Sequence, residues 1–216
     1  MRPGDKSNGI PVPVVRRLTK YLAHLQQVKT GGGGWVSSQQ LAKALNLTAA
    51  TVRRDFTHID FAGRTQRGYE IEGLEKTLLH VLGLDAGCNA VIVGAGNLGR
   101  ALALHQDFRK HAFRICAVFD SDPKLVGEKV GSLTVRSMGE LADVVQQEDI
   151  HIGIMAVPAA AARVVAFELI TAGVRGLLNL ACEHLNVPHD VTIVDARMVE
   201  SIQELLCLIK MRERTE

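Results

Sequence analysis

The apolar positions of the first 82 residues follow helical spacing. After Pro11 and Pro13 they recur every three or four residues, which places them on one face of a helix. The residues of this face are Val14, Leu18, Tyr21, Leu22 and Leu25. Two shorter helices are predicted within residues 38–56, where Asn46 takes the left-handed turn between them and Thr48 caps the second. A fourth helix is predicted at about residues 72–82, after two short extended pieces around a turn that contains glycine and arginine.

From residue 89 onward, short apolar runs of strand length alternate with helical segments. Strands are predicted at residues 89–93, 113–119, 133–136, 151–157, 174–180 and 191–194. Residues 159–172 and about 197–212 are predicted helices, and Ser137 and Glu140 form a capping box that opens another. Such alternation predicts an α/β fold with a mainly parallel sheet covered by helices.

The charge of the chain is unevenly distributed. The net charge is only +2. Residues 1–80 contain 12 Lys and Arg against 6 Asp and Glu, giving +6, whereas residues 81–216 contain 13 against 17, giving −4. The front part is therefore expected to attract a polyanion, and the back part is not.

The four cysteines are widely spaced and form no C-x-x-C pair, which is typical of a protein from a reducing compartment. No apolar run reaches the roughly 18–20 residues that a membrane span requires. The sequence therefore predicts a cytoplasmic protein with no membrane partner. No metal site is expected, because Cys182 and His184 lack further ligands at a suitable spacing.

A glycine motif directly follows the strand at residues 89–93. Its residues are Gly94, Ala95, Gly96, Asn97, Leu98 and Gly99, and a helical segment begins within it. In a nucleotide-binding βαβ unit, Gly94 permits the tight turn, Gly96 lets backbone N–H groups approach a pyrophosphate, and Gly99 lets the helix pack on the strand. The N-terminus of the helix also directs its positive dipole end at the anion.

An acidic residue stands at the distance that this motif requires. Asp120 ends the second strand, 21 residues after Gly99, where a carboxylate accepts hydrogen bonds from a ribose and repels a 2′-phosphate. NAD(H) is thus favoured over NADP(H). In the alternative interpretation, the glycines form a structural turn and Asp120 only caps the turn at Asp122. Val157 and Pro158 end the fourth strand, where the nicotinamide half is expected, although Pro158 is equally suited to the first position of a helix.

Residues 38–56 have the spacing of a helix-turn-helix. If Val52 and Phe56 face the core, Arg53 and Arg54 face a DNA groove, and two further arginines lie in the following turn as a wing. The residues predicted to contact DNA are Arg16, Arg17, Ser38, Thr48, Ala50, Thr51, Arg53, Arg54, Arg64, Arg67 and Gly68. In the alternative, this region is a cap or dimerisation domain with solvated arginines. Asp55 is also able to pair with one of its two arginine neighbours and so reduce the number that faces DNA.

Several of these motifs in combination resemble the Rex family of redox-sensing transcriptional repressors. The resemblance covers about residues 10–210 and is carried by residues 51–56, 67–69, 93–102, 119–127 and 156–159. It implies a homodimer that binds double-stranded operator DNA and is released when NADH rises relative to NAD⁺. It also implies a winged helix-turn-helix domain at 10–82, a Rossmann NAD(H)-binding domain at 83–195 and a dimerisation helix at 196–216 that swaps to the partner. Residues 1–9 are polar and contain Gly and Pro, which predicts a flexible tail.

The chain departs from the usual Rex pattern at a few positions. The family places residues near the nicotinamide and the subunit interface where this chain has His105 in place of Tyr, Asp195, and Ala196 in place of a bulky residue. The resemblance implies that His105 and Asp195 contribute to the cofactor site. In the wing, the basic residue is displaced to Arg67.

An alternative function for a chain with this glycine motif is that of an NAD-dependent dehydrogenase with an appended N-terminal domain. Such an enzyme needs a substrate pocket and an acid or base near the nicotinamide. Only one helix follows the βαβ units, and His105 and His184 are isolated. The sequence therefore favours a regulator over an enzyme.

Overall fold

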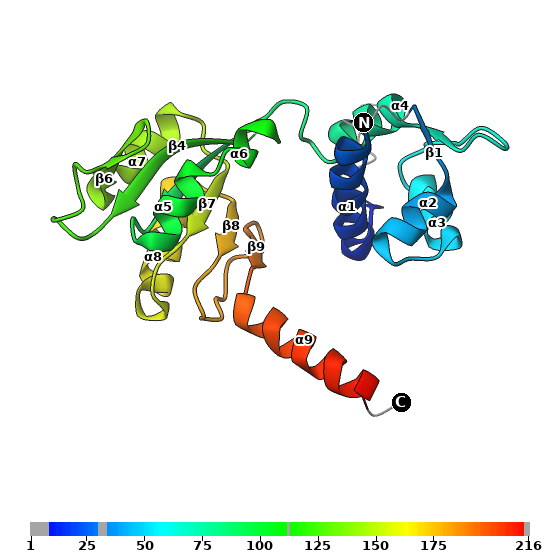
Figure 1. Ribbon diagram of the computed structural model, residues 1–216. Coiled ribbons are helices and arrows are strands. Elements are labelled where there is room, and N and C mark those ends of the chain that lie inside the picture. Colours follow the sequence, from blue (N-terminus) through cyan, green and yellow to red (C-terminus); the bar gives the residue numbers. More distant parts are fainter. Residues whose placement is uncertain (1–8, 30–33, 112, 214–216) are drawn as a thin grey trace. The chain divides into compact units, whose positions relative to one another are not determined.

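The computed structural model describes residues 9–29, 34–111 and 113–213. The tail predicted at residues 1–9 lies outside these residues, except for Gly9. The chain divides into two compact units, Met1–Ala86 and Gly87–Glu216 (Figure 1). Each unit has its own hydrophobic core.

Unit 1 consists of helices and a small two-stranded sheet. Its elements are α1 (Val12–Lys29), β1 (Trp35–Val36), α2 (Ser38–Leu45), α3 (Ala49–Thr57), β2 (Tyr69–Glu70) and α4 (Ile71–Val81). Strands β1 and β2 pair in antiparallel fashion. The strands flank the α2–α3 pair in the sequence, and the turn that leads into β2 supplies the wing, so the predicted winged helix-turn-helix arrangement is confirmed.

Local capping defines the turn between α2 and α3. Ser37 and Gln40 form a capping box at the start of α2, and Asn46 ends α2 with a left-handed φ of 54°. The Thr48 hydroxyl then accepts a hydrogen bond from the Thr51 N–H at the start of α3. The predicted roles of Asn46 and Thr48 are confirmed.

The core of unit 1 is formed by the predicted face of α1 packed against α2, α3 and α4. Its five α1 residues are all buried. A chain of edge-to-face aromatic contacts joins three elements, with ring centroids 5.2 Å apart for Tyr21 and Phe56 and 4.7 Å apart for Phe56 and Tyr69. Tyr69 thereby attaches the second strand of the wing to the helix pair.

Unit 2 is built on a sheet that has seven strands among the described residues, in the order β5-β6-β4-β3-β7-β8-β9. The strands are β3 (Cys88–Val93), β4 (Phe113–Asp120), β5 (Lys129–Val130), β6 (Leu133–Ser137), β7 (Ile152–Met155), β8 (Gly176–Asn179) and β9 (Thr192–Asp195). The helices are α5 (Asn97–Leu104), α6 (Asp107–Lys110), the 3₁₀ turn Met138–Glu140, α7 (Leu141–Gln147), α8 (Ala159–Ala172) and α9 (Met198–Glu213). Neighbouring strands run parallel except for the short β5, so the predicted α/β class is confirmed.

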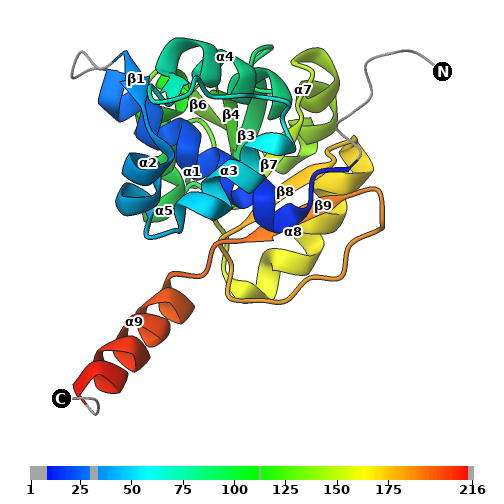
Figure 2. The same cartoon turned by 90° about the vertical axis from the view of Figure 1, so that its right-hand side faces the viewer.

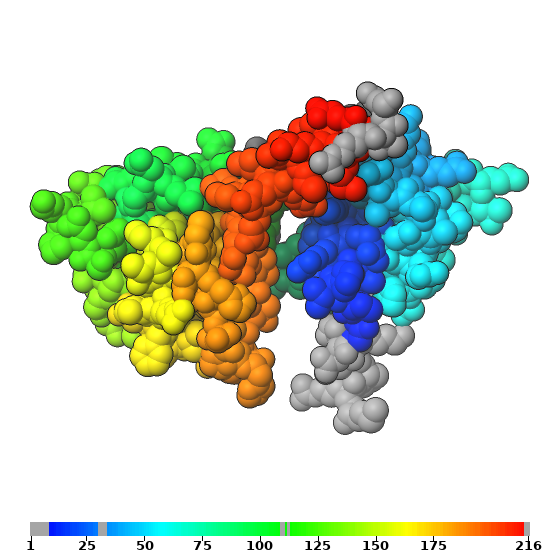
Figure 3. All heavy atoms as spheres, turned by 90° about the horizontal axis from the view of Figure 1, so that it is seen from below, coloured from blue at the N-terminus to red at the C-terminus, as the bar shows by residue number. Residues whose placement is uncertain are grey.

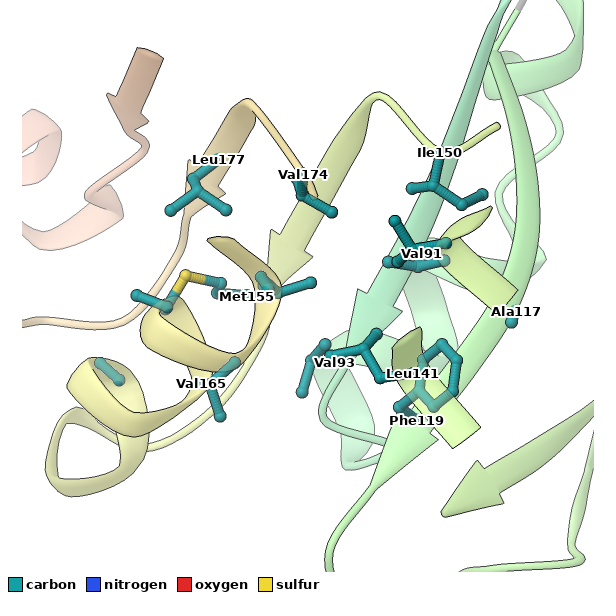
Figure 4. Packing of buried hydrophobic residues seen from close by; sticks show 14 of the residues in the cluster. Val91, Val93, Ala117, Phe119, Leu141, Ile150, Met155, Val165, Val174 and Leu177 are labelled. Atoms are coloured by element: carbon teal, nitrogen blue, oxygen red, sulfur yellow. The ribbon is translucent and has the colours of Figure 1, made fainter. Parts of the chain in front are cut away.

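Helices cover both faces of the sheet. On one face, Val91, Val93 and Phe119 pack with Leu141 of α7 and Val165 of α8 (Figure 4). The opposite face buries a second set of strand residues, which packs against α5 and α6. Because both faces are buried, the central strands are continuous apolar runs rather than alternating ones.

The order of the strands creates a crevice at one edge of the sheet. From β3 the chain proceeds outward through β4 and β6, and it then returns to place β7 on the other side of β3. Such a reversal opens a crevice at the carboxyl ends of the strands, where α/β proteins bind ligands. Val93 at the end of β3 lies opposite Met155 of β7, and Phe119 of β4 lies on its other side.

Helix α9 differs from the other helices of unit 2. It stands clear of the sheet of its own unit (Figures 1 and 2), and none of its residues is buried. The surface of α8 instead adjoins that of the segment at residues 180–190 (Figure 3), where Arg163 donates two hydrogen bonds to Glu183. None of the helices in the described part of the chain is long and apolar enough to cross a bilayer.

Candidate nucleotide-binding and DNA-binding sites

The glycine loop leaves no room for side chains at two positions and offers open space at a third. A Cβ on Gly94, whose φ is +104°, would lie 2.3 Å from the Ala156 oxygen, and one on Gly99 would lie 1.8 Å from the Gly94 oxygen. Both glycines are therefore required by close packing of the loop, β7 and α5. A Cβ on Gly96 would meet no atom within 4 Å. The space in front of Gly96 is thus open to a ligand.

The loop presents the start of α5 to that space. Gly96 is the N-cap of α5 and has no side chain with which to satisfy the N–H groups of the first turn. These groups and the helix dipole favour an anion at this point. Arg100 braces the loop from behind, because its Nε donates to the Ala95 oxygen at 2.7 Å and its guanidinium pairs with Glu128.

Asp120 is fixed by the backbone on both sides. Its Oδ2 accepts from the Ala95 N–H at 2.7 Å, and its Oδ1 accepts from the Asp122 N–H at 2.8 Å. The bond to Asp122 is the one that a purely structural role requires. The bond to Ala95 connects β4 to the glycine loop, and each carboxylate oxygen retains a lone pair for a ribose hydroxyl. The geometry is therefore compatible with the predicted ligand contact.

A cavity of about 410 Å³ lies at this edge of the sheet, a volume typical of small-molecule sites. It brings together the predicted residues Gly94, Gly96, Asp120, Val157 and Pro158. Ala95, Asn97, Leu98 and Gly99 shape the loop and are not part of the cavity wall. The wall also includes residues that sequence reasoning missed, namely Leu125, Met138, Val164 and Glu168. These come from separate segments that only the fold brings together.

His105 and Asp195 lie outside this cavity in the single chain. His105 ends α5, with its exposed ring 6.1 Å from that of Phe108, beside a separate hollow of about 310 Å³. Asp195 ends β9, where its Oδ1 accepts from Asn179 Nδ2 at 2.7 Å. It occupies the carboxyl edge of the sheet, with β8 between β9 and β7. Their assignment to the cofactor stays a prediction.

The outer surface of α3 exposes the predicted basic residues. Arg53 and Arg54 are exposed, and so is Ala50 beside them. Arg53 Nη1 donates to Ser38 Oγ at 3.3 Å, which ties this arginine to the start of α2. Small residues and two guanidinium groups thus share one surface, as base readout in a major groove requires.

Asp55 pairs with Arg17 and not with an arginine of its own helix. Arg17 Nε and Nη2 donate to the two oxygens of Asp55 at 2.6 and 2.7 Å, and the Tyr21 hydroxyl donates to Oδ2 at 2.8 Å. Asp55 is fully buried, so the pair joins α1 to α3 inside the unit. Burial first, and then the bond to Asp55, raises the pKa of Tyr21. The bond to Asp55 also raises the pKa of Arg17 above its usual value.

The bond between Arg17 and Asp55 changes the predicted role of Arg17 and decides which arginine pairs with Asp55. Arg17 was predicted as a phosphate contact, but its guanidinium fork is bound to Asp55, because a buried carboxylate requires a partner. Asp55 in turn leaves Arg53 and Arg54 on the surface. Arg16, the neighbour of Arg17, is exposed, and its phosphate contact stays a prediction.

The wing is a tight turn between Arg64 and Gly68. Arg64 N–H donates to the Gly68 oxygen at 2.7 Å, and Gly68 N–H returns a bond of 2.9 Å to the Arg64 oxygen. A Cβ on Gly68 would lie 2.4 Å from the Val36 oxygen, so this turn is packed against β1. Arg64 and Arg67 both lie over the ring of Trp35, a residue that sequence reasoning missed. Within the described ranges, no cluster of three or more His, Cys, Asp or Glu side chains is suited to hold a metal.

Known proteins match both units. Residues 9–57 match a family model described as "Putative DNA-binding protein N-terminus", and residues 86–182 match one described as "CoA binding domain". The redox-sensing transcriptional repressor Rex of Clostridium botulinum (strain Alaska E43 / Type E3) is 34% identical over 202 residues, which cover 94% of this chain and 96% of that protein. The chain belongs to the Rex family.

Solved structures of RSP, a Rex-family repressor, have the same fold. RSP in complex with NADH is 30% identical with a TM-score of 0.86, covering 95% of this chain and 97% of RSP. RSP in complex with NAD⁺ and operator DNA is 30% identical with a TM-score of 0.87, covering 96% and 95%. Because Rex proteins are transcriptional repressors, the dehydrogenase alternative is wrong for this chain.

Proposed function

We propose that this Rex protein represses transcription as a homodimer, binding operator DNA through unit 1 and NAD(H) through unit 2. NADH bound in unit 2 disfavours the DNA-binding state, and NAD⁺ permits it. The single observation that carries this proposal is the match of nearly the whole chain to RSP, both with NADH and with NAD⁺ and operator DNA. Repression of this kind takes place in the cytoplasm, where the chromosome lies.

The cofactor assignment rests on the shape and charge of the cavity. The open space at Gly96 and the uncapped start of α5 suit a pyrophosphate, and Asp120 suits an unphosphorylated adenosine ribose. Val157 and Pro158, at the end of β7, would meet the nicotinamide half. NAD⁺ and NADH differ only at the nicotinamide ring, by one charge and by the planarity of the ring. A hundredfold change in operator affinity then requires about 2.7 kcal/mol of differential binding between the two protein states.

The DNA assignment rests on the exposed surfaces of α3 and the wing. Ala50, Thr51, Arg53 and Arg54 would contact base edges. Ser38, Thr48 and Arg16 would contact the backbone, and Arg64, Arg67 and Gly68 would form the wing contact. Arg17 acts indirectly, because its bonds to Asp55 fix the position of α3 relative to α1.

The dimer assignment rests on the exposed apolar side chains of α9. They include Met198, Val199, Ile202, Leu205, Leu206, Leu208, Ile209 and Met211, each at least 46% exposed. Six of these eight fall on one side of the helix by its 3.6-residue period. A soluble single chain rarely exposes so continuous an apolar surface, so a partner subunit is the expected cover. The domain limits 10–82, 83–195 and 196–216 are proposed on the same grounds, with residues 196–216 swapped to the partner.

The experiment that tests this function is a selection of duplexes from a randomised library, performed once with NAD⁺ and once with NADH. We expect enrichment of one palindromic sequence in NAD⁺ and its loss in NADH. Enrichment of the same sequence to the same extent under both conditions would contradict redox control. Failure to enrich any sequence would contradict DNA binding.

A further inference from the structure

The only tryptophan of the chain lies beneath the two arginines of the wing. The Cζ atoms of Arg64 and Arg67 lie 5.3 and 5.1 Å from the centre of the Trp35 ring, within the range of a cation–π contact. Trp35 is half-buried in β1, opposite Glu70 of β2, and it comes two residues before the cap of α2. One aromatic ring thus contacts both cations of the wing.

The backbone holds this arrangement in place from the other side. Gln66 and Gly68 adopt left-handed φ angles of 63° and 86°, and two hydrogen bonds close the turn between Arg64 and Gly68. Gly68 approaches the Val36 oxygen too closely to accept a side chain. The base of the turn is therefore fixed against the residue that follows Trp35.

The chemistry explains why a ring is useful here. Arginine side chains have many rotamers, and two neighbouring guanidinium groups repel each other. The negative face of an indole attracts both groups and stacks on their planes. Arginines that are already ordered in the free protein lose less conformational entropy when they bind a polyanion.

We propose that Trp35 is a positioning residue that orders Arg64 and Arg67 for contact with the DNA duplex. It acts through the two arginines. The proposal rests on the proposed function in that the polyanion is operator DNA. The ordering itself is a property of the free protein and is measurable without DNA.

The first test uses tryptophan fluorescence. Trp35 is the single tryptophan of the chain, so the signal comes from this residue. In the free protein, the double variant Arg64→Gln and Arg67→Gln should make Trp35 more accessible to quenching by acrylamide. Lys43→Gln, which removes an exposed charge of α2, is the matched control and should leave quenching unchanged. Equal quenching of the wild type and the double variant would overturn the proposal while leaving the proposed function intact.

The second test is a double-mutant cycle on the duplex selected by the wild-type protein in NAD⁺. Trp35→Leu should weaken binding by about two- to fivefold, as expected for loss of cation–π contacts at a partly exposed site, and Trp35→Phe should restore most of the loss. In the background of Arg64→Gln and Arg67→Gln, Trp35→Leu should have no further effect. In the background of Lys43→Gln, it should retain its full effect.

The outcomes separate the two proposals. If Trp35→Leu weakens binding equally in all backgrounds, or if Trp35→Phe is as weak as Trp35→Leu, the residue has only a structural role in the β1–β2 pair and the proposal is overturned. If the wild-type protein selects no duplex, the proposed function fails and the positioning role falls with it, whatever acrylamide quenching reports.

Discussion

The side-chain amide of Asn179 donates a hydrogen bond of 2.7 Å to Asp195 Oδ1 and so joins the carboxyl ends of β8 and β9. Asn179 is fully buried, and its amide also donates to the Glu183 oxygen and accepts from the Ala181 N–H. Its backbone oxygen accepts from the Ala196 N–H at 2.9 Å. One residue therefore holds both the segment after β8 and the segment that leads to α9.

Replacement of Asn179 by aspartate tests this relationship. Asn179→Asp keeps the size of the side chain but removes its donor and faces Asp195 with a second carboxylate. We expect the free energy of unfolding to fall by about 1–3 kcal/mol, the cost of leaving buried polar groups unpaired. Urea denaturation measures this change. We also expect a weaker response of DNA binding to NADH, because the start of α9 is released.

Asn89→Asp is a matched control for this variant. Asn89 lies at the start of β3 and donates to the Glu148 oxygen, at the opposite edge of the sheet from the cavity. Its replacement should lower stability and leave the NADH response unchanged. If both variants alter the response equally, Asn179 has no special connection to α9.

The buried pair between Arg17 and Asp55 predicts a loss of stability when Asp55 is replaced. Asp55→Ala leaves Arg17 and Tyr21 without their acceptor. Because Arg17 is partly exposed, we expect a loss of about 2–3 kcal/mol, below the roughly 3–5 kcal/mol cost of breaking a fully buried ion pair. Thermal or urea unfolding of unit 1 measures it. An unchanged unfolding midpoint would mean that the pair does not stabilise the contact between α1 and α3.

Replacement of Arg54 is expected to weaken DNA binding and to leave stability unchanged. Arg54→Ala should weaken binding to the selected duplex by about 1–3 kcal/mol, the value of one good base contact, with unchanged stability and NADH affinity. Arg136→Ala, which removes an exposed charge of β6 in unit 2, is the control and should leave DNA binding unchanged. Fluorescence anisotropy with selected and unrelated duplexes measures both. An equal loss on both duplexes would make Arg54 a phosphate contact.

The four cysteines are expected to fall into two classes. Cys88 and Cys116 are half-buried, and burial raises the pKa of both thiols, whereas Cys182 and Cys207 are exposed. A disulfide reagent at pH 8 should therefore modify Cys182 quickly and Cys88 and Cys116 slowly, because only the thiolate reacts. Variants in which each cysteine is replaced by serine assign the phases. Fast reaction of Cys88 or Cys116 would contradict this assignment.

The same pKa shifts predict the sign of a pH effect on stability. A thiol with a raised pKa in the folded state contributes stability that is complete below its unfolded pKa of about 8.5 and is lost as the pH rises through the folded value. The free energy of unfolding should therefore decrease between about pH 8.5 and the raised pKa values of Cys88 and Cys116. The decrease should be smaller in Cys116→Ala.

The sequence predicts those features that depend on local chemistry. The caps at Ser37 and Thr48 and the left-handed Asn46 follow from side chains one turn apart or less. The glycine loop and Asp120 are recognisable because a fixed spacing along the chain reflects a fixed geometry.

Features that depend on distant residues were missed. Arg17 and Asp55 are 38 residues apart, so their pairing was not visible in the sequence, and Arg17 was expected on the surface. Trp35 reaches the wing only because β1 pairs with β2. The two-residue strand β5 and the four-residue helix α6 are too short to produce a periodic pattern.

The different surroundings of Gly96 and Gly99 allow NADH binding to be removed without loss of the fold. A Cβ at Gly96 meets no atom within 4 Å, whereas a Cβ at Gly99 lies 1.8 Å from the Gly94 oxygen of the loop. Gly96→Val should therefore preserve the fold, DNA binding and thermal stability, but lose NADH binding. Gly99→Ala should destabilise unit 2 instead.

The most direct measurement is the anisotropy of the selected duplex bound to wild-type protein, titrated with NADH at a fixed NAD⁺ concentration. The account predicts that NADH releases the duplex from the wild type and leaves Gly96→Val bound throughout the titration. Retention of the duplex by the wild type at saturating NADH, or its release from Gly96→Val at the same NADH concentration, would contradict it.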